Sequence, residues 1–149
     1  MKRKVVIVSK APSLAKKRLA KQIGRDEATR VYAAIFKKII SELSDYNPLV
    51  FIKPWEKKEE FNDLCNGCEM HPQIGDDLGE IMLNSFNKAK DDEDDMVALM
   101  GGDILNFKKE IIDDAFILLE SVDIVVGPSE DGRSMLMSNS SRYDYWSIE

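Results

Sequence analysis

The chain has 149 residues, of which 44% are hydrophobic and 32% are charged. This composition predicts one globular domain over residues 1–149, because the chain is long enough to bury a core and too apolar to be disordered. The formal net charge of −6 argues against a general nucleic-acid-binding protein, whose surface should be basic. No apolar run approaches the roughly 20 residues that cross a bilayer, so no membrane partner is expected.

The basic residues of this acidic chain are concentrated near its N-terminus. The first 21 residues contain eight Lys and Arg residues and no Asp or Glu. This asymmetry indicates a local anion-binding site rather than a surface for polyanions. The apolar run 5–8 follows a basic start, as in a signal peptide, but it is too short for one. We therefore expect a strand at 5–8, a cytoplasmic location and reduced cysteines.

Apolar patterns along the chain predict strands that alternate with helices. Short apolar or β-branched runs predict strands at 5–8, 49–52, 69–71, 96–100 and 124–126. Apolar residues at helical spacing predict amphipathic helices at 26–43, 78–89 and 108–119. The polar stretch 56–64 is compatible with a helix, and the acidic run 91–95 is expected to be a solvated loop. This alternation predicts a three-layer α/β/α fold with a mainly parallel sheet covered on both faces.

Ligands of such sheets bind at the carboxyl ends of the strands, which selects the loops 9–18, 101–106 and 127–133. The first loop is basic, and arginine and lysine side chains there could surround a triphosphate. They are Lys10, Lys16, Lys17 and Arg18. The loop is not a Walker loop, because it has no Gly-x-x-x-x-Gly-Lys pattern. By composition alone, a phosphate site and a solvated basic face are equally compatible with it.

The other two loops contain acidic residues. Asp103 follows a buried strand and two glycines, which suits a magnesium ion shared between protein and phosphates. Its alternative role is to cap the next turn or helix. In the third loop Glu130 or Asp131 could be a second metal contact, although the sequence there is also ordinary turn chemistry. One basic and two acidic loops at the same edge together predict a nucleotide–metal site.

Five short segments, in order, resemble one family of transferases. They are Lys10-Ala-Pro12 with Arg18-Leu19, the run 73–82, Gly102-Asp103, the run 127–132, and Trp146-Ser147. The family is that of the glycosyltransferase-A-like arsenosugar-biosynthesis glycosyltransferases, which are relatives of molybdenum-cofactor guanylyltransferase and of the sugar nucleotidyltransferases. The resemblance implies a Rossmann-like nucleotide-diphospho-sugar transferase fold. It also implies transfer from a nucleoside triphosphate or sugar nucleotide to a small-molecule acceptor, with Mg²⁺ or Mn²⁺ as cofactor.

The resemblance also implies roles for particular residues. Three basic residues would hold the nucleotide phosphates: Lys10, Lys16 and Arg18. Two acidic residues would be catalytic and would bind the metal: Asp103 and, assisting it, Asp131. Three residues would lie near the base or the ribose: Asp77, Gly79 and Glu80. Metal and basic side chains would then neutralise charge that develops on the phosphate leaving group.

The sequence also departs from this family. The first loop is two residues shorter than the family's loop and lacks its glycine, and the run 13–19 is closer to the 2-phospho-L-lactate guanylyltransferases. The runs 104–107 and 133–135 differ, and the chain ends at Glu149, where the family continues, so a C-terminally shortened fold is expected. The alternative function is therefore a divergent, catalytically degenerate member that binds a nucleotide or a protein partner without turnover. The oligomeric state also stays open, and a homodimer is one possibility.

The motif Cys65-Asn-Gly-Cys68 has the spacing of a redox or metal site. It does not lie at a strand end that opens a helix, and only His71 is nearby as a further zinc ligand. We expect neither a functional dithiol nor a zinc site here.

Overall fold

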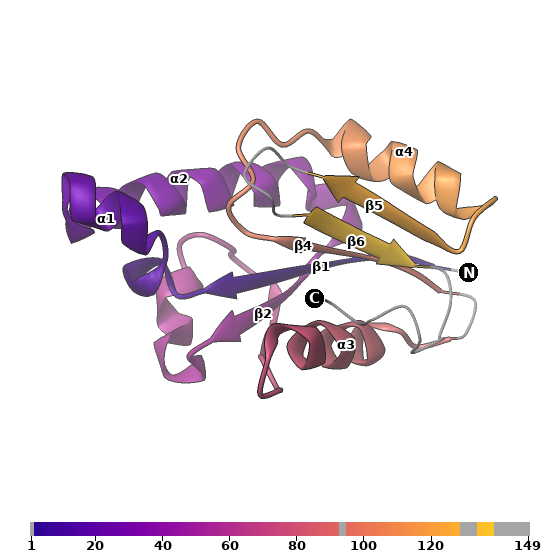
Figure 1. The fold of residues 1–149 in the computed structure, drawn as a ribbon, viewed down its shortest axis with the longest axis horizontal. Coiled ribbons are helices and arrows are strands. Elements are labelled where there is room, and N and C mark those ends of the chain that lie inside the picture. The colour runs from indigo at the N-terminus through magenta and orange to yellow at the C-terminus, as the bar shows by residue number, and fades with distance from the viewer. Residues whose placement is uncertain (1, 93–94, 129–133, 139–149) are drawn as a thin grey trace.

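The computed structural model describes residues 2–92, 95–128 and 134–138, which form one six-stranded sheet with helices on both faces (Figure 1). The strands are β1 (Arg3–Lys10), β2 (Leu49–Lys53), β3 (Glu69–Pro72), β4 (Met96–Gly101), β5 (Ile124–Pro128) and β6 (Ser134–Ser138). The sheet order is β3-β2-β1-β4-β6-β5. The first four strands are parallel, and β6 is antiparallel to both of its neighbours. The mainly parallel α/β fold predicted from the sequence is confirmed.

The described residues contain four α-helices, of which the last three cover the sheet: α1 (Lys17–Ile23), α2 (Arg25–Glu42), α3 (Leu78–Ala89) and α4 (Lys109–Leu119). Helices α2 and α4 lie on one face and α3 lies on the other (Figure 1). Three 3₁₀ segments connect elements: η1 (Pro12–Leu14), η2 (Ser44–Tyr46) and η3 (Trp55–Phe61). None of the helices in the described part of the chain has the length and apolar character that a membrane span requires.

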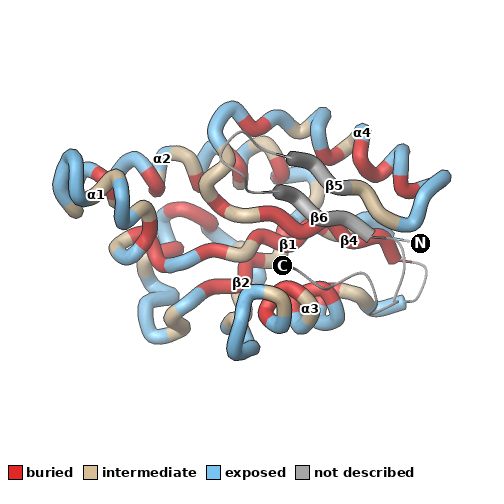
Figure 2. Tube along the Cα trace, viewed as in Figure 1, coloured by how far each residue is buried: buried red, intermediate tan, exposed pale blue. Residues whose placement is uncertain are grey.

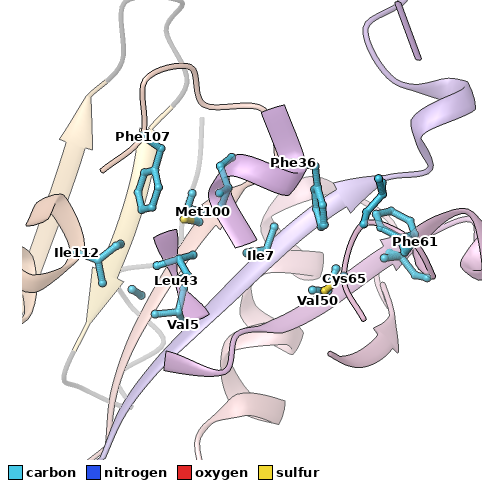
Figure 3. Close-up of a cluster of buried hydrophobic side chains, with 14 of the residues drawn as sticks. Val5, Ile7, Phe36, Leu43, Val50, Phe61, Cys65, Met100, Phe107 and Ile112 are labelled. Atoms are coloured by element: carbon cyan, nitrogen blue, oxygen red, sulfur yellow. The ribbon is translucent and has the colours of Figure 1, made fainter. Parts of the chain in front are cut away.

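Alternate residues of the central strands fill two cores, one on each face of the sheet. Val5 and Ile7 of β1 pack on the α2 and α4 side together with Phe36, whereas Val6 packs on the α3 side with Phe86. Figure 3 shows the larger of these two clusters, and Figure 2 shows that buried residues follow the central strands. Because β1 is covered on both faces, the loop that follows it starts from a rigid position.

The sequence patterns missed one α-helix and one strand of the described residues. Helix α1 lies partly in the stretch assigned to the basic loop, and none of its residues is buried, so it has no apolar stripe to reveal it. Gly24 separates α1 from α2 with a φ of 92°, a conformation that glycine adopts without strain. Strand β6 was also missed, because its antiparallel pairing with β4 and β5 is a long-range feature that local patterns do not show.

The expectation of a wholly solvated acidic loop at 91–95 is wrong for Asp95. Its side chain is fully buried, and its carboxylate accepts hydrogen bonds from the backbone N–H groups of Lys2 (3.0 Å), Asp91 (3.1 Å) and Asp92 (3.1 Å). Burial alone would raise the pKa of Asp95, but these N–H donors and the charge of Lys4 outweigh burial and lower the pKa. Asp95 therefore fastens the start of β1 to the start of β4.

The expectation of reduced cysteines is also wrong, because the structure joins Cys65 and Cys68 in a disulfide. The backbone N–H of Cys68 donates to the carbonyl of Cys65 (3.2 Å), and this tight turn brings the two Cα atoms to 5.4 Å. That separation lies within the range in which two cysteines can be bridged.

Candidate functional site

The carboxyl ends of β1 and β4 form the point at which the strand order of the sheet reverses. Strand β2 pairs with one side of β1 and strand β4 pairs with the other. At this edge Val8 of β1 is in register with Gly101 of β4. In open α/β sheets, ligands bind outside the strand ends at this kind of switch point. The predicted basic loop and the loop that carries Asp103 therefore leave the sheet beside each other.

Lys16 and Asp103 meet across these two loops. The Nζ atom of Lys16 lies 4.0 Å from Oδ2 of Asp103, and their side chains are only 22% and 11% exposed. The structure thus brings together one predicted phosphate ligand and the predicted metal ligand. A cation and a carboxylate in so sheltered a place interact more strongly than a pair at the open surface.

The backbone at Lys16 has a left-handed conformation, with φ 53° and ψ 52°, immediately before α1. For a residue other than glycine this costs roughly 1–2 kcal/mol, so neighbouring contacts must hold it. Before Lys16, Ser13 donates from its backbone N–H (2.9 Å) and its hydroxyl (2.8 Å) to the carboxylate of Glu60, and the Arg25 guanidinium donates to the carbonyl of Ala15 (2.5 Å). After Lys16, helix α1 begins, and the backbone N–H of Ala20 donates to the Lys16 carbonyl (2.9 Å). The backbone is therefore held before and after Lys16.

The other two predicted phosphate ligands lie on the same loop. Lys10 is the last residue of β1, and Arg18 lies in the first turn of α1. Both side chains are exposed, so they can reach an incoming anion from solvent. The loop therefore presents the sheltered Lys16 together with exposed cations that include Lys10 and Arg18 at this edge of the sheet.

Gly102 allows helix α2 to approach the end of β4 closely. A Cβ atom at residue 102 would lie 2.8 Å from the hydroxyl oxygen of Tyr32 and 2.9 Å from Cδ2 of Phe36, both of which belong to α2. The hydroxyl of Ser9 donates to the carbonyl of Lys10 (2.8 Å), so the Tyr32 hydroxyl is the donor in its hydrogen bond to Ser9. Tyr32 therefore lies against Ser9 and Gly102, the residues that directly precede Lys10 and Asp103.

Gln73 connects three strand ends at the same edge. Its backbone N–H donates to the carbonyl of Ile52 (3.1 Å), and its side-chain amide Nε2 donates to the carbonyls of Ser9 (2.9 Å) and Phe51 (3.0 Å). Sequence reasoning included Gln73 in a family-like segment but gave it no role. Tyr32 was likewise missed, because on a helical pattern it looks like an ordinary core residue.

Asp77, Gly79 and Glu80 lie at the start of α3. The Asp77 carboxylate accepts a hydrogen bond from the N–H of Glu80 (2.8 Å), and the Glu80 carboxylate accepts one from the N–H of Asp76 (2.7 Å). This arrangement is similar to a capping box, with the Glu80 contact shifted to the residue before the N-cap, and it stabilises the helix N-terminus without any ligand. Strand β2 lies between β3, which leads into this segment, and β1. The role of the three residues toward a base or ribose stays a prediction.

Within the described residues, Asp103 is the predicted metal ligand that can be assessed, because Asp131 lies in the segment 129–133 outside them. No group of three or more His, Cys, Asp or Glu in the described part of the chain could hold a metal ion. Magnesium, however, is commonly bound by one or two carboxylates together with water and substrate phosphates. The donor set therefore fits a metal ion that arrives with a phosphate ligand, and it does not fit a metal cage made by the protein.

A cavity of about 390 Å³ lies between α3 and β3, the edge strand. His71, Ile74, Asn84 and Lys88 are among its lining residues, and the ring of His71 stacks on Phe51 with 5.0 Å between centroids. The residues on either side of Gln73, Pro72 and Ile74, line the cavity, but none of the predicted site residues does. No sequence pattern predicted this cavity.

Comparison with known protein families places the chain in one of them. The model of the family described as "Uncharacterized protein conserved in bacteria (DUF2064)" matches residues 37–140, which is more than half of the chain. No curated protein matches the chain.

Several solved structures resemble the chain, among them the following two. The first is a "putative nucleotide-diphospho-sugar transferase" from Desulfovibrio desulfuricans G20, with a TM-score of 0.84 and 27% identity over 97% of this chain and 69% of that one. The second is a cytidylyltransferase from Leptospira borgpetersenii serovar Hardjo-bovis (strain JB197), with a TM-score of 0.61 and 12% identity over 93% of this chain and 61% of that one. The first match confirms the nucleotide-diphospho-sugar transferase-like fold, and the second, at its low identity, bears on the fold alone.

Proposed function

The chain belongs to the DUF2064 family, and from this premise we propose that it is a metal-dependent transferase acting on a nucleoside triphosphate or a sugar nucleotide. The observation that carries the proposal is the sheltered pair formed by Lys16 and Asp103 at the switch point of the sheet. A cation for phosphate and a carboxylate for a divalent ion are the two complements that a metal–nucleotide complex requires. The likeness to a nucleotide-diphospho-sugar transferase structure supports the same class of ligand.

The chemistry would be a displacement at the nucleotide. In nucleotidyl transfer, an acceptor oxygen forms a bond to the α-phosphorus while pyrophosphate leaves; in glycosyl transfer, it forms a bond to the anomeric carbon while the nucleoside diphosphate leaves. A bound Mg²⁺ or Mn²⁺ would offset the charge that develops on the leaving phosphates. Lys16 would donate hydrogen bonds to those phosphate oxygens, with Lys10 and Arg18 binding from the exposed side. Because the loop is held by Glu60 and Arg25, little reordering would be needed on binding.

A melting-temperature screen with nucleoside triphosphates and sugar nucleotides, each with and without Mn²⁺, tests this function. A ligand at 100 times its dissociation constant stabilises a protein by about 2.7 kcal/mol, which is a rise of about 5–11 °C for a chain of this size. We expect such a rise with metal and nucleotide together, and its loss in Asp103→Asn. Asp114→Asn, which removes the same charge from an exposed position on α4, is the matched control and should keep the rise. No rise with any nucleotide at millimolar concentration would refute the proposal.

Mass spectrometry then separates transfer from binding alone. The stabilising nucleotide, incubated with Mn²⁺ and a panel of small alcohols, phosphates and sugars, should yield a nucleotidyl or glycosyl product that Asp103→Asn does not form. Stabilisation without product from any acceptor would favour the alternative, in which the chain binds a nucleotide without turnover.

A further inference from the structure

The sheltered ion pair has a consequence for how ligands enter the site, and this consequence rests on the proposed function. We infer that Lys16 is an internal counter-ion of Asp103 that transfers from the carboxylate to the ligand phosphates when metal and phosphates arrive together. The site would therefore select the metal–phosphate complex over either free component.

A metal ion that arrives alone meets Asp103 beside a cation. Its side chain is 11% exposed, so few positions remain from which a cation can approach it, and the ammonium group of Lys16 already lies 4.0 Å from one carboxylate oxygen. A divalent ion that enters alone meets a carboxylate whose charge is offset, and it is repelled by the ammonium group. Metal alone should therefore bind weakly.

Phosphates that arrive alone meet Lys16 beside a carboxylate. The loop that carries Lys16 also carries the exposed cations Lys10 and Arg18, so an anion can approach it from solvent. An anion that enters without metal must compete with the Asp103 carboxylate for Lys16, and it also lies near that carboxylate, which repels it. Phosphate alone should therefore bind more weakly than it would if Lys16 were not paired with Asp103.

Both electrostatic penalties disappear when metal and phosphates arrive together. When metal and phosphates enter as one complex, the metal offsets Asp103 and the phosphates offset Lys16, so neither charge loses a partner. The backbone that carries Lys16 need not move, because Glu60 and Arg25 hold the residues before it and the first turn of α1 holds it from the other side. A rotation of the long lysine side chain is enough for the transfer. Such coupling between two ligands is reciprocal and is typically 5–150-fold.

The test is a pair of binding titrations on Lys16→Met, with Mn²⁺ alone and with inorganic triphosphate alone in metal-free buffer. We expect Lys16→Met to bind Mn²⁺ at least about five-fold more tightly than the wild type and to bind triphosphate more weakly. With both ligands present, the factor by which each tightens the other should fall in the variant. Lys37→Met removes the same charge from an exposed position on α2 and should change neither affinity.

Two further variants keep the result interpretable. Adding Asp103→Asn to Lys16→Met should abolish the gain in Mn²⁺ affinity, which shows that the gain arises at this carboxylate. Lys16→Asn removes the same charge with a side chain that tolerates the left-handed backbone, and it should reproduce the Mn²⁺ result if the methionine variant folds poorly. An unchanged Mn²⁺ affinity in both Lys16 variants would overturn the inference. The Mn²⁺ titration uses no nucleotide, so a chain that binds no nucleotide but shows the Mn²⁺ gain refutes the proposed function and not the counter-ion.

Discussion

Replacing Gly102 with alanine tests the close approach of α2 to the end of β4. The new Cβ would lie 2.8 Å from the hydroxyl of Tyr32 and 2.9 Å from Cδ2 of Phe36, and both side chains are buried, at 3% and 0% exposure. Neither ring can move without disturbing the core, so we expect the cost of an overpacked site, about 1–3 kcal/mol. For a chain of this size that is a fall in melting temperature of about 2–12 °C.

Urea unfolding followed by tryptophan fluorescence measures this cost, and Gly101→Ala is its matched control. A Cβ at residue 101 would meet only Oδ1 of Asp103, at 3.5 Å, which is an ordinary contact, so little change is expected. Because residue 102 precedes Asp103, Gly102→Ala should also weaken the metal-dependent stabilisation by nucleotide. If Gly102→Ala is as stable as Gly101→Ala, the reasoning about this contact is wrong.

Three further changes test other contacts near the strand ends. Gln73→Glu leaves the carbonyls of Ser9 and Phe51 without their side-chain donor and should lower the free energy of unfolding by about 1–3 kcal/mol in the same assay. Wild-type stability would refute the idea that Gln73 stabilises these strand ends. Asp77→Ala should lower the stability of the ligand-free protein by about 0.5–2 kcal/mol, whereas Asp77→Asn, which keeps the cap, should not; equal effects would contradict the capping role. The lowered pKa of Asp95 means that its stabilisation is present above about pH 4 and is lost as the pH falls through the folded-state pKa. The stability difference between wild type and Asp95→Asn, measured by urea unfolding, should therefore shrink from neutral pH to about pH 3. A difference that stays constant would refute the stabilising role of the charged Asp95 carboxylate.

Much of the fold follows from local patterns. Helix α3 begins and ends at the residues that its apolar spacing predicts. The buried runs that became β1, β2 and β4 are visible as short β-branched or apolar segments, although β1 extends at both ends into charged residues. Strand β6 and helix α1 could not be found in this way, because the first depends on pairing with distant strands and the second buries no side chain.

The candidate site was predictable in part. The topology rule brought the loops after β1 and β4 together, and Lys16 and Asp103 do meet there. The sequence could not distinguish Lys16 from the exposed Lys10, because the difference depends on a left-handed backbone and on shelter provided by the fold. Gln73 and Tyr32 were beyond sequence reasoning for the same cause, since their partners are strand-end groups brought near only by the fold.

The most direct test of the central claim locates the bound ligand by amide NMR on isotopically labelled protein. Mg²⁺ and the nucleotide that stabilises the chain most would be added together, and the displaced backbone amide resonances would be assigned. We expect the largest displacements in the loop 9–18 after β1 and in residues 101–106 after β4, with much smaller ones in Asp103→Asn. Displacements confined to the cavity between α3 and β3, or equal displacements in Asp103→Asn, would contradict a nucleotide–metal site at the switch point of the sheet.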